Sequence, residues 1–322
     1  MSSPRRPVHR RHLWGSCLLA LSLLLTACGL TDKADGKPSP GPTSGASTPG
    51  PPSLAEKKNL LVGLKKGQPG FSTKHGDVFE GFEADLTEEL AEKVGFVPDY
   101  RDIPSLRREE ILKNQTADLI VATYSVTGPR DEQVDFTAPY IKTYQGLLVR
   151  DDNTGIKELN DVDGKRVCTA RGSTSDPESV RKKEQQEAIK KALGPNVKPG
   201  FRKDYKECVL EMRDDGNFDA VWTDKILLKG YERDYKGIHV VDNITVESPQ
   251  FYAVGLRQGD EKFCRRLNKA LKEFVFSADW RAYFKSHFDK VYKEDKSGFQ
   301  AKYRPTRDEF DEMAKDSCGA AD

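Results

Sequence analysis

The sequence predicts an α/β protein of two lobes. Short apolar segments typical of strands alternate with segments of helical period, as in α/β folds. A similar set of segments begins again near Arg166, and later apolar segments return the chain to the first set. The folded part, roughly 265 residues long, has the length expected for two lobes with a core each.

The first lobe is predicted to comprise residues 57–149 and 250–290. Its clearest helix covers Glu83–Val94, where apolar residues recur at helical spacing and Gly95 follows as a stop signal. The other segments of this lobe are predicted strands over Leu60–Leu64, Ala117–Ala122, Gln145–Val149 and Phe251–Leu256, and helices over Leu106–Leu112, Phe263–Phe276 and Trp280–Phe288.

The second lobe is predicted to comprise residues 150–249. Its segments are strands over Arg166–Thr169, Ala220–Thr223 and Ile238–Val241, and helices over Asp176–Leu193 and Tyr205–Met212. We expect two hinge strands between the lobes, with crossings near Val149–Asp152 and Val246–Gln250. Residues 291–322 are mostly charged and poorly periodic, which indicates a C-terminal tail.

The N-terminal segment has the composition of a signal peptide. Four arginines precede the apolar stretch Leu13–Leu25, which is short for a membrane span. The stretch ends in Leu-Thr-Ala-Cys at residues 25–28, which resembles a lipobox. We therefore expect residues 1–28 to be a lipoprotein signal with Cys28 as the lipidated residue. A chance cysteine after an ordinary signal peptide is the alternative.

Residues 29–56 are rich in proline, glycine and serine, and this composition favours a disordered linker. A lipid anchor, a tether and a folded part indicate an exported protein held at the outer face of the bacterial cytoplasmic membrane. The part after the signal has 48 basic and 51 acidic residues. That near-neutral charge gives no electrostatic basis for nucleic-acid binding.

The cysteines indicate disulfides and no metal site. Cys17 and Cys28 belong to the signal region, and the other four are an even number in an exported chain. Three pairings are possible, and we favour Cys168–Cys208 and Cys264–Cys318. No Cys-x-x-Cys pair occurs, so neither a metal nor another cofactor is expected.

The run from Leu119 to Tyr140 carries the strongest indication of a ligand site. An apolar strand breaks into a hydroxyl-rich turn, Thr123 to Thr127, and Arg130 follows. Hydroxyls and turn amides beside a fixed guanidinium suit a carboxylate, which arginine binds through two parallel hydrogen bonds. The alternative is a strand edge with a surface salt bridge.

Six sequence fragments, in order, resemble the bacterial solute-binding proteins for polar amino acids (family 3), and most of all the actinobacterial glutamate-binding lipoproteins. The fragments are Val-Gly-Leu-Lys at 62–65 with Gln-Pro-Gly at 68–70, Gly-Phe-Glu-Ala-Asp-Leu at 81–86, Ala-Thr-Tyr-Ser at 122–125 with Arg130, Pro-Tyr at 139–140, Gly-Ser-Thr at 172–174, and Asp-Ala-Val-Trp-Thr-Asp at 219–224. This resemblance implies a periplasmic-binding-protein-like fold of type II, with the ligand between the lobes and an ABC permease as partner.

The resemblance also implies a role for individual residues. Arg130 would bind the α-carboxylate of an amino acid, helped by Ser125 and Thr174. Asp224 would accept the α-ammonium, because a buried cation without a carboxylate partner is costly; the alternative for Asp224 is a helix N-cap. Thr123 would add an oxygen acceptor for the ammonium.

Lys65 indicates the substrate. Relatives that take basic amino acids tend to have an acidic residue at this position, so a lysine favours an anionic side chain such as that of glutamate. A solvated loop lysine is the alternative. Arg171 is a second candidate for the distal carboxylate. Tyr124 is a candidate wall for the aliphatic stem, although an aromatic residue here is equally compatible with the core.

The resemblance implies capture of the ligand by closure of the lobes, without a chemical reaction. Two alternatives share the fold. A dehydratase would need a general acid or base in place of Asp224, and no Ser/His or Cys/His pairing is evident. A receptor that signals to a membrane protein would have the same ligand site, so the sequence does not separate it from a transport protein.

Overall fold

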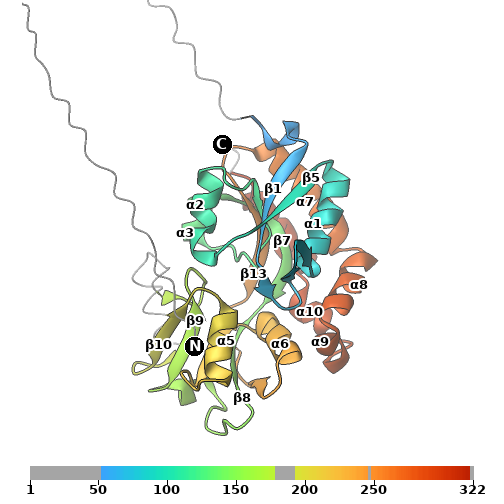
Figure 1. Cartoon of the computed structure of the whole chain (residues 1–322). Coiled ribbons are helices and arrows are strands. Elements are labelled where there is room, and N and C mark those ends of the chain that lie inside the picture. Colours follow the sequence, from blue (N-terminus) through green and yellow to red (C-terminus); the bar gives the residue numbers. More distant parts are fainter. Residues whose placement is uncertain (1–51, 178–192, 246–247, 320–322) are drawn as a thin grey trace, which may run out of the picture. The chain divides into compact units, whose positions relative to one another are not determined.

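A computed structural model describes residues 52–177, 193–245 and 248–319 (Figure 1). The predicted signal peptide, the predicted lipidation site Cys28 and most of the predicted linker lie outside these residues. Most of the predicted helix over Asp176–Leu193 lies outside them as well. Within the described part of the chain, no helix is both long and apolar enough to cross a membrane.

The first lobe is built on a five-stranded sheet with the order β5-β1-β6-β13-β7. Its strands are β1 (Asn59–Leu64), β5 (Val97–Asp102), β6 (Leu119–Ile120), β7 (Asp135–Thr143) and β13 (Gln250–Leu256). Strand β1 runs parallel to β5 and β6, whereas β13 pairs antiparallel with β6 and β7. The sheet therefore joins early strands of the chain to a strand that returns from the second lobe.

The second lobe repeats this plan with the order β10-β9-β11-β8-β12. Its strands are β8 (Gln145–Arg150), β9 (Arg166–Ala170), β10 (Lys198–Arg202), β11 (Ala220–Asp224) and β12 (Ile238–Val240). Strand β9 is parallel to β10 and β11, and β8 is antiparallel to β11 and β12. Two α/β units, as the sequence predicted, therefore form the described structure.

The first crossing between the lobes differs from the prediction. Strand β7 belongs to the first sheet and β8 to the second, so the chain crosses at Tyr144 rather than near Val149–Asp152. Residues 135–149 are almost all buried although several of them are polar, and no glycine–proline turn signal marks the change of sheet at Tyr144. The second crossing lies between β12 and β13, and residues 246 and 247 of the predicted hinge Val246–Gln250 lie outside the described residues.

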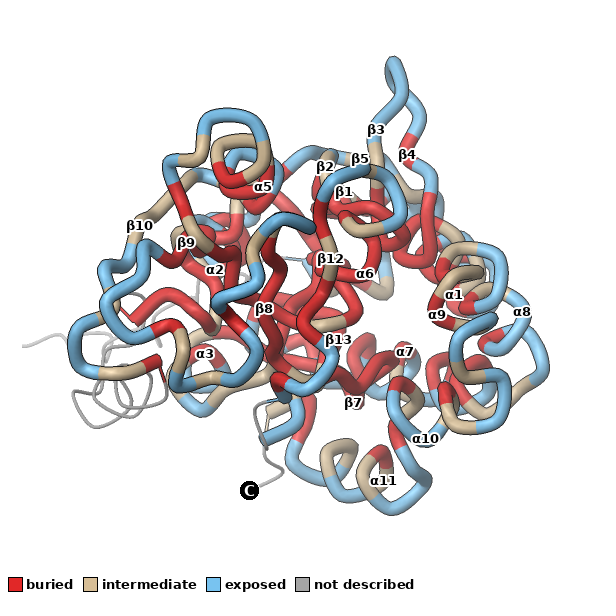
Figure 2. Tube along the Cα trace, turned by 90° about the horizontal axis from the view of Figure 1, so that it is seen from below, coloured by how far each residue is buried: buried red, intermediate tan, exposed pale blue. Residues whose placement is uncertain are grey.

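Helices cover the sheets and bury their apolar faces against them. Those of the first lobe are α1 (Phe82–Val94), α2 (Arg108–Lys113), α3 (Gly128–Asp131), α7 (Glu261–Val275) and α8 (Ala278–His287); those of the second are α5 (Tyr205–Arg213) and α6 (Lys225–Asp234). Figure 2 shows buried backbone concentrated along β7, β8 and β13, where the two sheets approach each other. The core thus continues through the crossings.

Several short elements have no counterpart in the sequence prediction. They are the small sheet of β2 (Gly67–Gln68), β3 (Ser72–His75) and β4 (Val78–Glu80), and the 3₁₀ helices η1 (Leu54–Glu56) and η3 (Leu159–Val162). A third 3₁₀ helix, η2 (Ser105–Arg107), overlaps the start of the predicted helix Leu106–Leu112 and precedes α2. Two of these short elements bear on the ligand site, because β2 and η2 lie next to Lys65 and Arg108.

The folded part begins before the predicted end of the linker at residue 56. The Ser53 hydroxyl caps η1, and the Leu54 side chain is fully buried. The Leu54 amide donates to Oδ2 of Asp260 at 2.7 Å. The buried Leu54 side chain and the hydrogen bond from its amide to Asp260 hold this short segment against the first lobe. The composition of the segment does not predict either contact.

The predicted C-terminal tail contains three helices, α9 (Asp289–Glu294), α10 (Phe299–Tyr303) and α11 (Arg307–Asp316). Phe299 is fully buried against Trp280 and Phe284. Thr306 and Glu309 form a capping box at the start of α11. The prediction of a tail was wrong because the segment is mostly charged, and its few aromatic residues, which pack against the first lobe, did not produce a periodic pattern.

The structure contains both favoured disulfides. Cys168–Cys208 joins β9 to α5 within the second lobe, and Cys264–Cys318 joins α7 to the segment after α11. Each lobe therefore has one covalent link of its own.

Candidate ligand-binding site

A small cavity lies between the lobes, and both lobes contribute its lining. The first lobe provides Lys65, Ser105, Arg108, Thr123, Ser125 and Arg130, and the second provides Ser173, Thr174, Tyr205, Thr223, Asp224 and Leu227. Six of the eight residues predicted to bind ligand are in this lining; Tyr124 and Arg171 are not. Leu227 is the one lining residue without a polar side-chain atom, which suits a small, polar ligand.

Arg130 lies on α3, the short helix after the hydroxyl-rich turn. Its terminal nitrogens donate to the carbonyl of Ser125 at 2.8 Å and to the carbonyl of Gly172 at 2.9 Å. Its Nε lies 3.2 Å from Oε1 of Glu109. Burial lowers the pKa of Arg130 to about 10, so the guanidinium remains charged at neutral pH.

Arg108, at the start of α2, is a second cavity arginine that the sequence analysis missed. It is 2% exposed, and its guanidinium donates to the carbonyls of Ser105, Ala122 and Gly172 at 3.1 Å. The adjacent Arg107 is exposed and pairs with Glu110. Two neighbouring arginines in a charged helix resemble a solvated surface, so residue type alone gave no reason to separate them.

Tyr124 lies beneath the two arginines rather than along the ligand cavity. Its ring centroid is 4.3 Å from the guanidinium carbon of Arg108 and 5.3 Å from that of Arg130. The ring also packs edge-on against Phe136 in the core, at 4.7 Å between centroids. The Tyr124 ring therefore packs against both guanidinium groups on one side and against the core on the other. Its position is the one expected of a core aromatic residue.

Lys65 follows β1 and points its ammonium into the cavity, where it donates to the hydroxyl of Ser105. Its side chain is buried, which excludes the alternative of a solvated loop lysine. Burial, and then the nearby charge of Arg108, lower the pKa of Lys65 to about 7. A second, adjoining hollow also includes Lys65, together with Tyr205 and Tyr231 of the second lobe.

Asp224 ends β11 and occupies the position before α6. Its side chain makes no capping hydrogen bond to the helix, although its position is that of an N-cap. One carboxylate oxygen accepts from the hydroxyl of Tyr252, and the other is buried with no hydrogen-bond partner. Burial raises the pKa of Asp224 to about 6. A buried oxygen without a donor is a ready acceptor for an ammonium group.

Thr123 has a left-handed backbone, with φ of 44°, which is uncommon for a β-branched residue. Its amide donates to Oε1 of Glu83 and its hydroxyl to Oε1 of Gln68 at 3.1 Å. Glu83 is fully buried, and burial raises its pKa to about 7. The conformation of the turn is thus held by a carboxylate beneath it.

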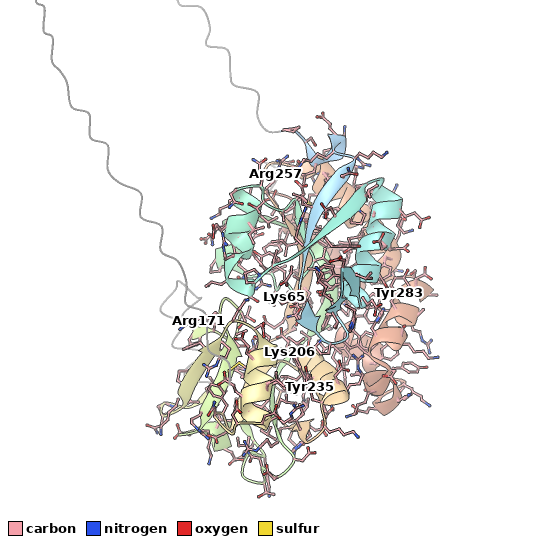
Figure 3. All side chains as sticks on the ribbon, in the orientation of Figure 1. Lys65, Arg171, Lys206, Tyr235, Arg257 and Tyr283 are labelled. Atoms are coloured by element: carbon pink, nitrogen blue, oxygen red, sulfur yellow. A yellow bond between two sulfur atoms is a disulfide. The ribbon has the colours of Figure 1, made fainter. Side chains whose placement is uncertain are left out.

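Arg171 does not reach the cavity lining. Its guanidinium stacks on Phe201, with 4.1 Å between the guanidinium carbon and the ring centroid. Figure 3 labels Arg171 on the second lobe and Lys65 on the first. The prediction of Arg171 as a partner for the distal carboxylate has no support from this position, because its guanidinium packs on an aromatic ring outside the lining.

The cavity lining contains three cationic side chains, Lys65, Arg108 and Arg130, and one carboxylate, Asp224. Two further carboxylates lie outside the lining but contact it: Glu83 accepts from the amide of Thr123, and Glu109 pairs with Arg130. All three cations belong to the first lobe. An uneven balance of this kind in a buried site favours a ligand with more negative than positive groups.

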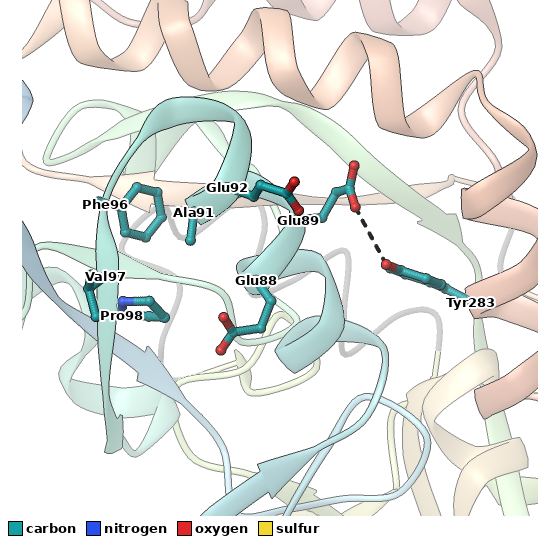
Figure 4. Close-up of a pocket in the computed structure, with 8 residues that line it drawn as sticks. All are labelled: Glu88, Glu89, Ala91, Glu92, Phe96, Val97, Pro98 and Tyr283. Atoms are coloured by element: carbon teal, nitrogen blue, oxygen red, sulfur yellow. Dashed lines mark hydrogen bonds between the residues drawn. The ribbon is translucent and has the colours of Figure 1, made fainter.

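A different hollow lies on the surface of the first lobe (Figure 4). Three glutamates of α1, Glu88, Glu89 and Glu92, line it beside apolar residues, and the hydroxyl of Tyr283 donates to Glu89 at 3.5 Å. Its lining includes no cation and no residue of the second lobe, so it offers neither a carboxylate site nor a role in closure.

Comparisons with known proteins agree with this arrangement. Residues 60–290 match the sequence profile of the bacterial extracellular solute-binding proteins, family 3. The glutamate-binding protein GluB of Corynebacterium glutamicum is 31% identical over 84% of this chain and 88% of its own length. The arginine-binding extracellular protein ArtP of Bacillus subtilis is 29% identical over 79% of this chain and 88% of its own.

Among solved structures, an ancestral arginine-binding protein bound to glutamine is 26% identical and has a TM-score of 0.64. The match covers 72% of this chain and 98% of that protein. The described structure thus has the two-lobed, type II architecture of periplasmic binding proteins. The chain belongs to family 3 of the bacterial extracellular solute-binding proteins.

Proposed function

We propose that this protein is the substrate-binding lipoprotein of an ABC importer for an acidic amino acid, and that the amino acid is glutamate. The observation that carries the proposal is the charge of the cavity lining, with three cations against one carboxylate. An amino acid with a carboxylate side chain has two negative groups and one positive group, and it complements this lining.

Each group of the ligand has a partner in the proposed complex. Arg130 binds the α-carboxylate, with Ser125 and Thr174 beside it. The unpartnered oxygen of Asp224 accepts the α-ammonium. Lys65, with Arg108 next to it, binds the distal carboxylate. The ion pairs form in a site from which closure excludes water, where each is stronger than at the surface.

The ligands of related proteins do not decide among amino acids, because GluB is named for glutamate and ArtP for arginine. The charge of the lining supports the choice of glutamate. An arginine ligand would place an additional guanidinium among three buried cations, and the lining residues contain no second carboxylate to offset it. Glutamine would leave Lys65 without an anionic partner.

The remaining parts of the proposal concern delivery. Residues 1–28 direct export, lipid on Cys28 anchors the chain, and the segment that follows is the tether. Capture by closure presents a new surface to the permease. We expect no catalysis, since the relatives are named as binding proteins and Asp224 and Arg130 suit an ammonium and a carboxylate.

Calorimetric titration of residues 29–322 with L-glutamate, L-aspartate, L-glutamine, L-asparagine, L-arginine and L-histidine tests the proposal. We expect glutamate to bind most tightly. Preferred binding of arginine or glutamine would overturn the argument from the charge of the cavity. Binding of none of these ligands would overturn the proposed function and favour a receptor or a dehydratase.

A further inference from the structure

Glu109 contacts two residues of the ligand site but does not line the cavity. Its Oε1 lies 3.2 Å from Nε of Arg130, and the same oxygen accepts from the hydroxyl of Tyr124 at 2.9 Å. The side chains of Glu109 and Arg130 are 19% and 10% exposed, so solvent screens their interaction only partly. Tyr124 in turn supports the face of the Arg130 guanidinium.

We propose that Glu109 is a positioning residue that orients Arg130 for a bidentate contact with a ligand carboxylate; this inference rests on the proposed function. Arginine has five N–H donors in a rigid plane. In the described structure, two of them donate to the carbonyls of Ser125 and Gly172, and the Nε atom lies in an ion pair 3.2 Å from Oε1 of Glu109. One donor remains on each terminal nitrogen, which is the pair that a carboxylate needs.

The contact at Nε also decides which edge of the guanidinium is available. A carboxylate can pair with the edge that includes Nε or with the edge formed by the two terminal nitrogens. Because the Glu109 carboxylate lies 3.2 Å from Nε, a ligand carboxylate at the first edge would be repelled by it, and the second edge is favoured for the ligand. The negative charge of Glu109 also opposes the repulsion between Arg130 and Arg108, since it favours the charged form of Arg130.

Replacement of Glu109 tests this role, and Glu110 on the same helix provides a matched control. Glu110 is exposed and pairs with Arg107. We expect Glu109→Ala to weaken binding of glutamate and glutamine by the same factor, about tenfold, because both ligands have the α-carboxylate that Arg130 holds. Glu109→Gln keeps an oxygen acceptor and should restore most of the affinity, whereas Glu110→Ala should change nothing.

Unchanged affinity in Glu109→Ala, with wild-type binding intact, would overturn the inference and leave the proposed function standing. Failure of the wild-type chain to bind any amino acid would instead count against the proposed function. If Glu109→Ala does not fold, as judged by circular dichroism, Glu109→Met takes its place, because it keeps the length of the side chain without a carboxylate and should weaken binding to the same degree. A thermal shift without a change in affinity would indicate a purely structural role and would also overturn the inference.

A second, independent feature is the C-terminal segment of residues 289–318, nearly all of which lies beyond the family match at residues 60–290. Helices α10 and α11 pack against β7, the strand that leads to the first crossing. Helix α9 packs against α6 of the second lobe. The disulfide Cys264–Cys318 fastens the end of the segment to α7 of the first lobe.

Ion pairs connect this segment to both lobes. Glu294 of α9 lies 3.3 Å from Lys229 of α6, and Lys290 lies 3.1 Å from Glu232 of α6. On the first lobe, Glu309 of α11 lies 3.1 Å from Lys142, one residue before the end of β7. Lys229 and Lys142 are largely buried, so these pairs are less screened than ordinary surface pairs.

Helix α6 links the segment to the ligand site, because it begins directly after Asp224. The geometry points to α9 as a latch that holds α6, and with it the second lobe, in the closed position. For α9 to act in this way, opening of the lobes must break its contact with α6. A contact that opening breaks shifts the equilibrium toward the closed form and slows release of ligand.

Reversal of one charge tests the latch. We expect Glu294→Lys to raise the dissociation rate of glutamate about threefold, a size typical of a partly exposed pair. Glu294→Gln, which removes the charge without reversing it, should raise the rate less than Glu294→Lys does. A reciprocal swap is unsuitable, because Lys229 also lies 3.2 Å from Glu232 and 3.5 Å from Asp242. Lys293→Glu is the control, because Lys293 is exposed and pairs only with Asp289 of its own helix among the described residues.

X-ray scattering without ligand gives a readout that does not depend on the proposed function. We expect Glu294→Lys to have a larger mean radius of gyration than the wild-type chain. Unchanged scattering and an unchanged dissociation rate would overturn the latch. Circular dichroism separates disruption of folding from opening. If Glu294→Lys does not fold, Glu294→Gln provides the same comparison.

Discussion

The two lobes contribute opposite charges to the site. The first lobe provides Lys65, Arg108 and Arg130, and each donates to an oxygen of the protein. The second lobe provides Asp224, one oxygen of which has no partner, and the carbonyl of Gly172. The cationic half is therefore pre-organised within one lobe, whereas the anionic half reaches it only when the lobes meet.

This difference suggests that the first lobe makes the initial contact with the ligand and that the second lobe completes the site. The first lobe holds its cations in place through Tyr124, Glu109 and backbone carbonyls, so it is suited to meet an anionic ligand first. The second lobe then completes the site and joins the first through Gly172, whose carbonyl accepts from both arginines. Substitutions on each side should separate these two contributions.

Arg130→Ala should have the largest effect, because it removes the main anion-binding group of the first lobe. We expect binding of every amino acid to weaken by about 100- to 1000-fold, as for loss of one partner of a buried charged pair. Calorimetry measures the affinity, and circular dichroism checks the fold. Arg107→Ala, on the exposed neighbour of Arg108, should bind normally. Retained affinity in Arg130→Ala would remove this residue from the site.

Asp224→Asn tests the second lobe alone. The asparagine can still accept from Tyr252 but no longer neutralises an ammonium, so we expect about 100-fold weaker binding. Since burial raises the pKa of Asp224 to about 6, wild-type affinity should also fall as the pH drops below about 6 and the carboxylate takes up a proton. An affinity in Asp224→Asn equal to that of the control Asp214→Asn would contradict the assignment.

Gly172→Ala tests how the lobes meet. A Cβ at this position would lie 2.4 Å from Cα of Leu106 and 2.6 Å from its amide nitrogen, both in the backbone of the other lobe. We expect about tenfold weaker binding, because closure becomes less favourable. Gly164→Ala is a matched control, since Gly164 has the same φ of 75° but no atom within 4 Å of a Cβ. Equal affinities for the two variants would show that backbone strain alone accounts for the loss.

Lys65→Met should have the smallest effect and should change selectivity. We expect glutamate to bind about fivefold more weakly, because the lost ion pair must first offset the cost of burying and protonating Lys65, and glutamine to be nearly unaffected. The pKa of Lys65 is lowered to about 7, so a distal carboxylate should draw a proton onto the amine as it binds. Glutamate affinity should therefore fall as the pH rises above about 7, and glutamine affinity should not.

Calorimetry in buffers of different ionisation enthalpy measures this proton uptake directly. The Lys65→Met variant should bind glutamate without uptake, and the exposed neighbour Lys66 offers the control Lys66→Met. Proton uptake that persists in Lys65→Met would assign the titration to another group. Glu83 is the first candidate, because burial raises its pKa to about 7.

The sequence predicted the parts of the site that depend on local pattern. Arg130 and Asp224 each follow a buried strand, and such positions are recognisable from the order of apolar and polar residues. Arg108 was not predictable in this way, because its burial depends on the carbonyl of Gly172, 64 residues later in the chain. Tyr124 and Arg171 were misplaced because residue type does not reveal the direction of a side chain.

The same distinction applies to the fold. Helices with a continuous apolar face, such as α1 and α7, were predicted within a few residues. The crossing at Tyr144 and the C-terminal helices were not, since both depend on which distant surface a segment meets. Val149 continues an apolar run without interruption, and Phe299 is one aromatic residue in a charged stretch. The local sequence pattern does not predict those tertiary contacts.

The link between Cys264 and Cys318 has a consequence for the biogenesis of the protein. The two residues are 54 positions apart, and an oxidised pair requires that both have left the reducing cytoplasm. During export, the first lobe cannot receive its final cross-link until the helices after α8 have emerged. A chain halted in translocation between these cysteines would expose the surface of β7 that α10 and α11 normally cover. Such an incomplete chain would be accessible to proteases.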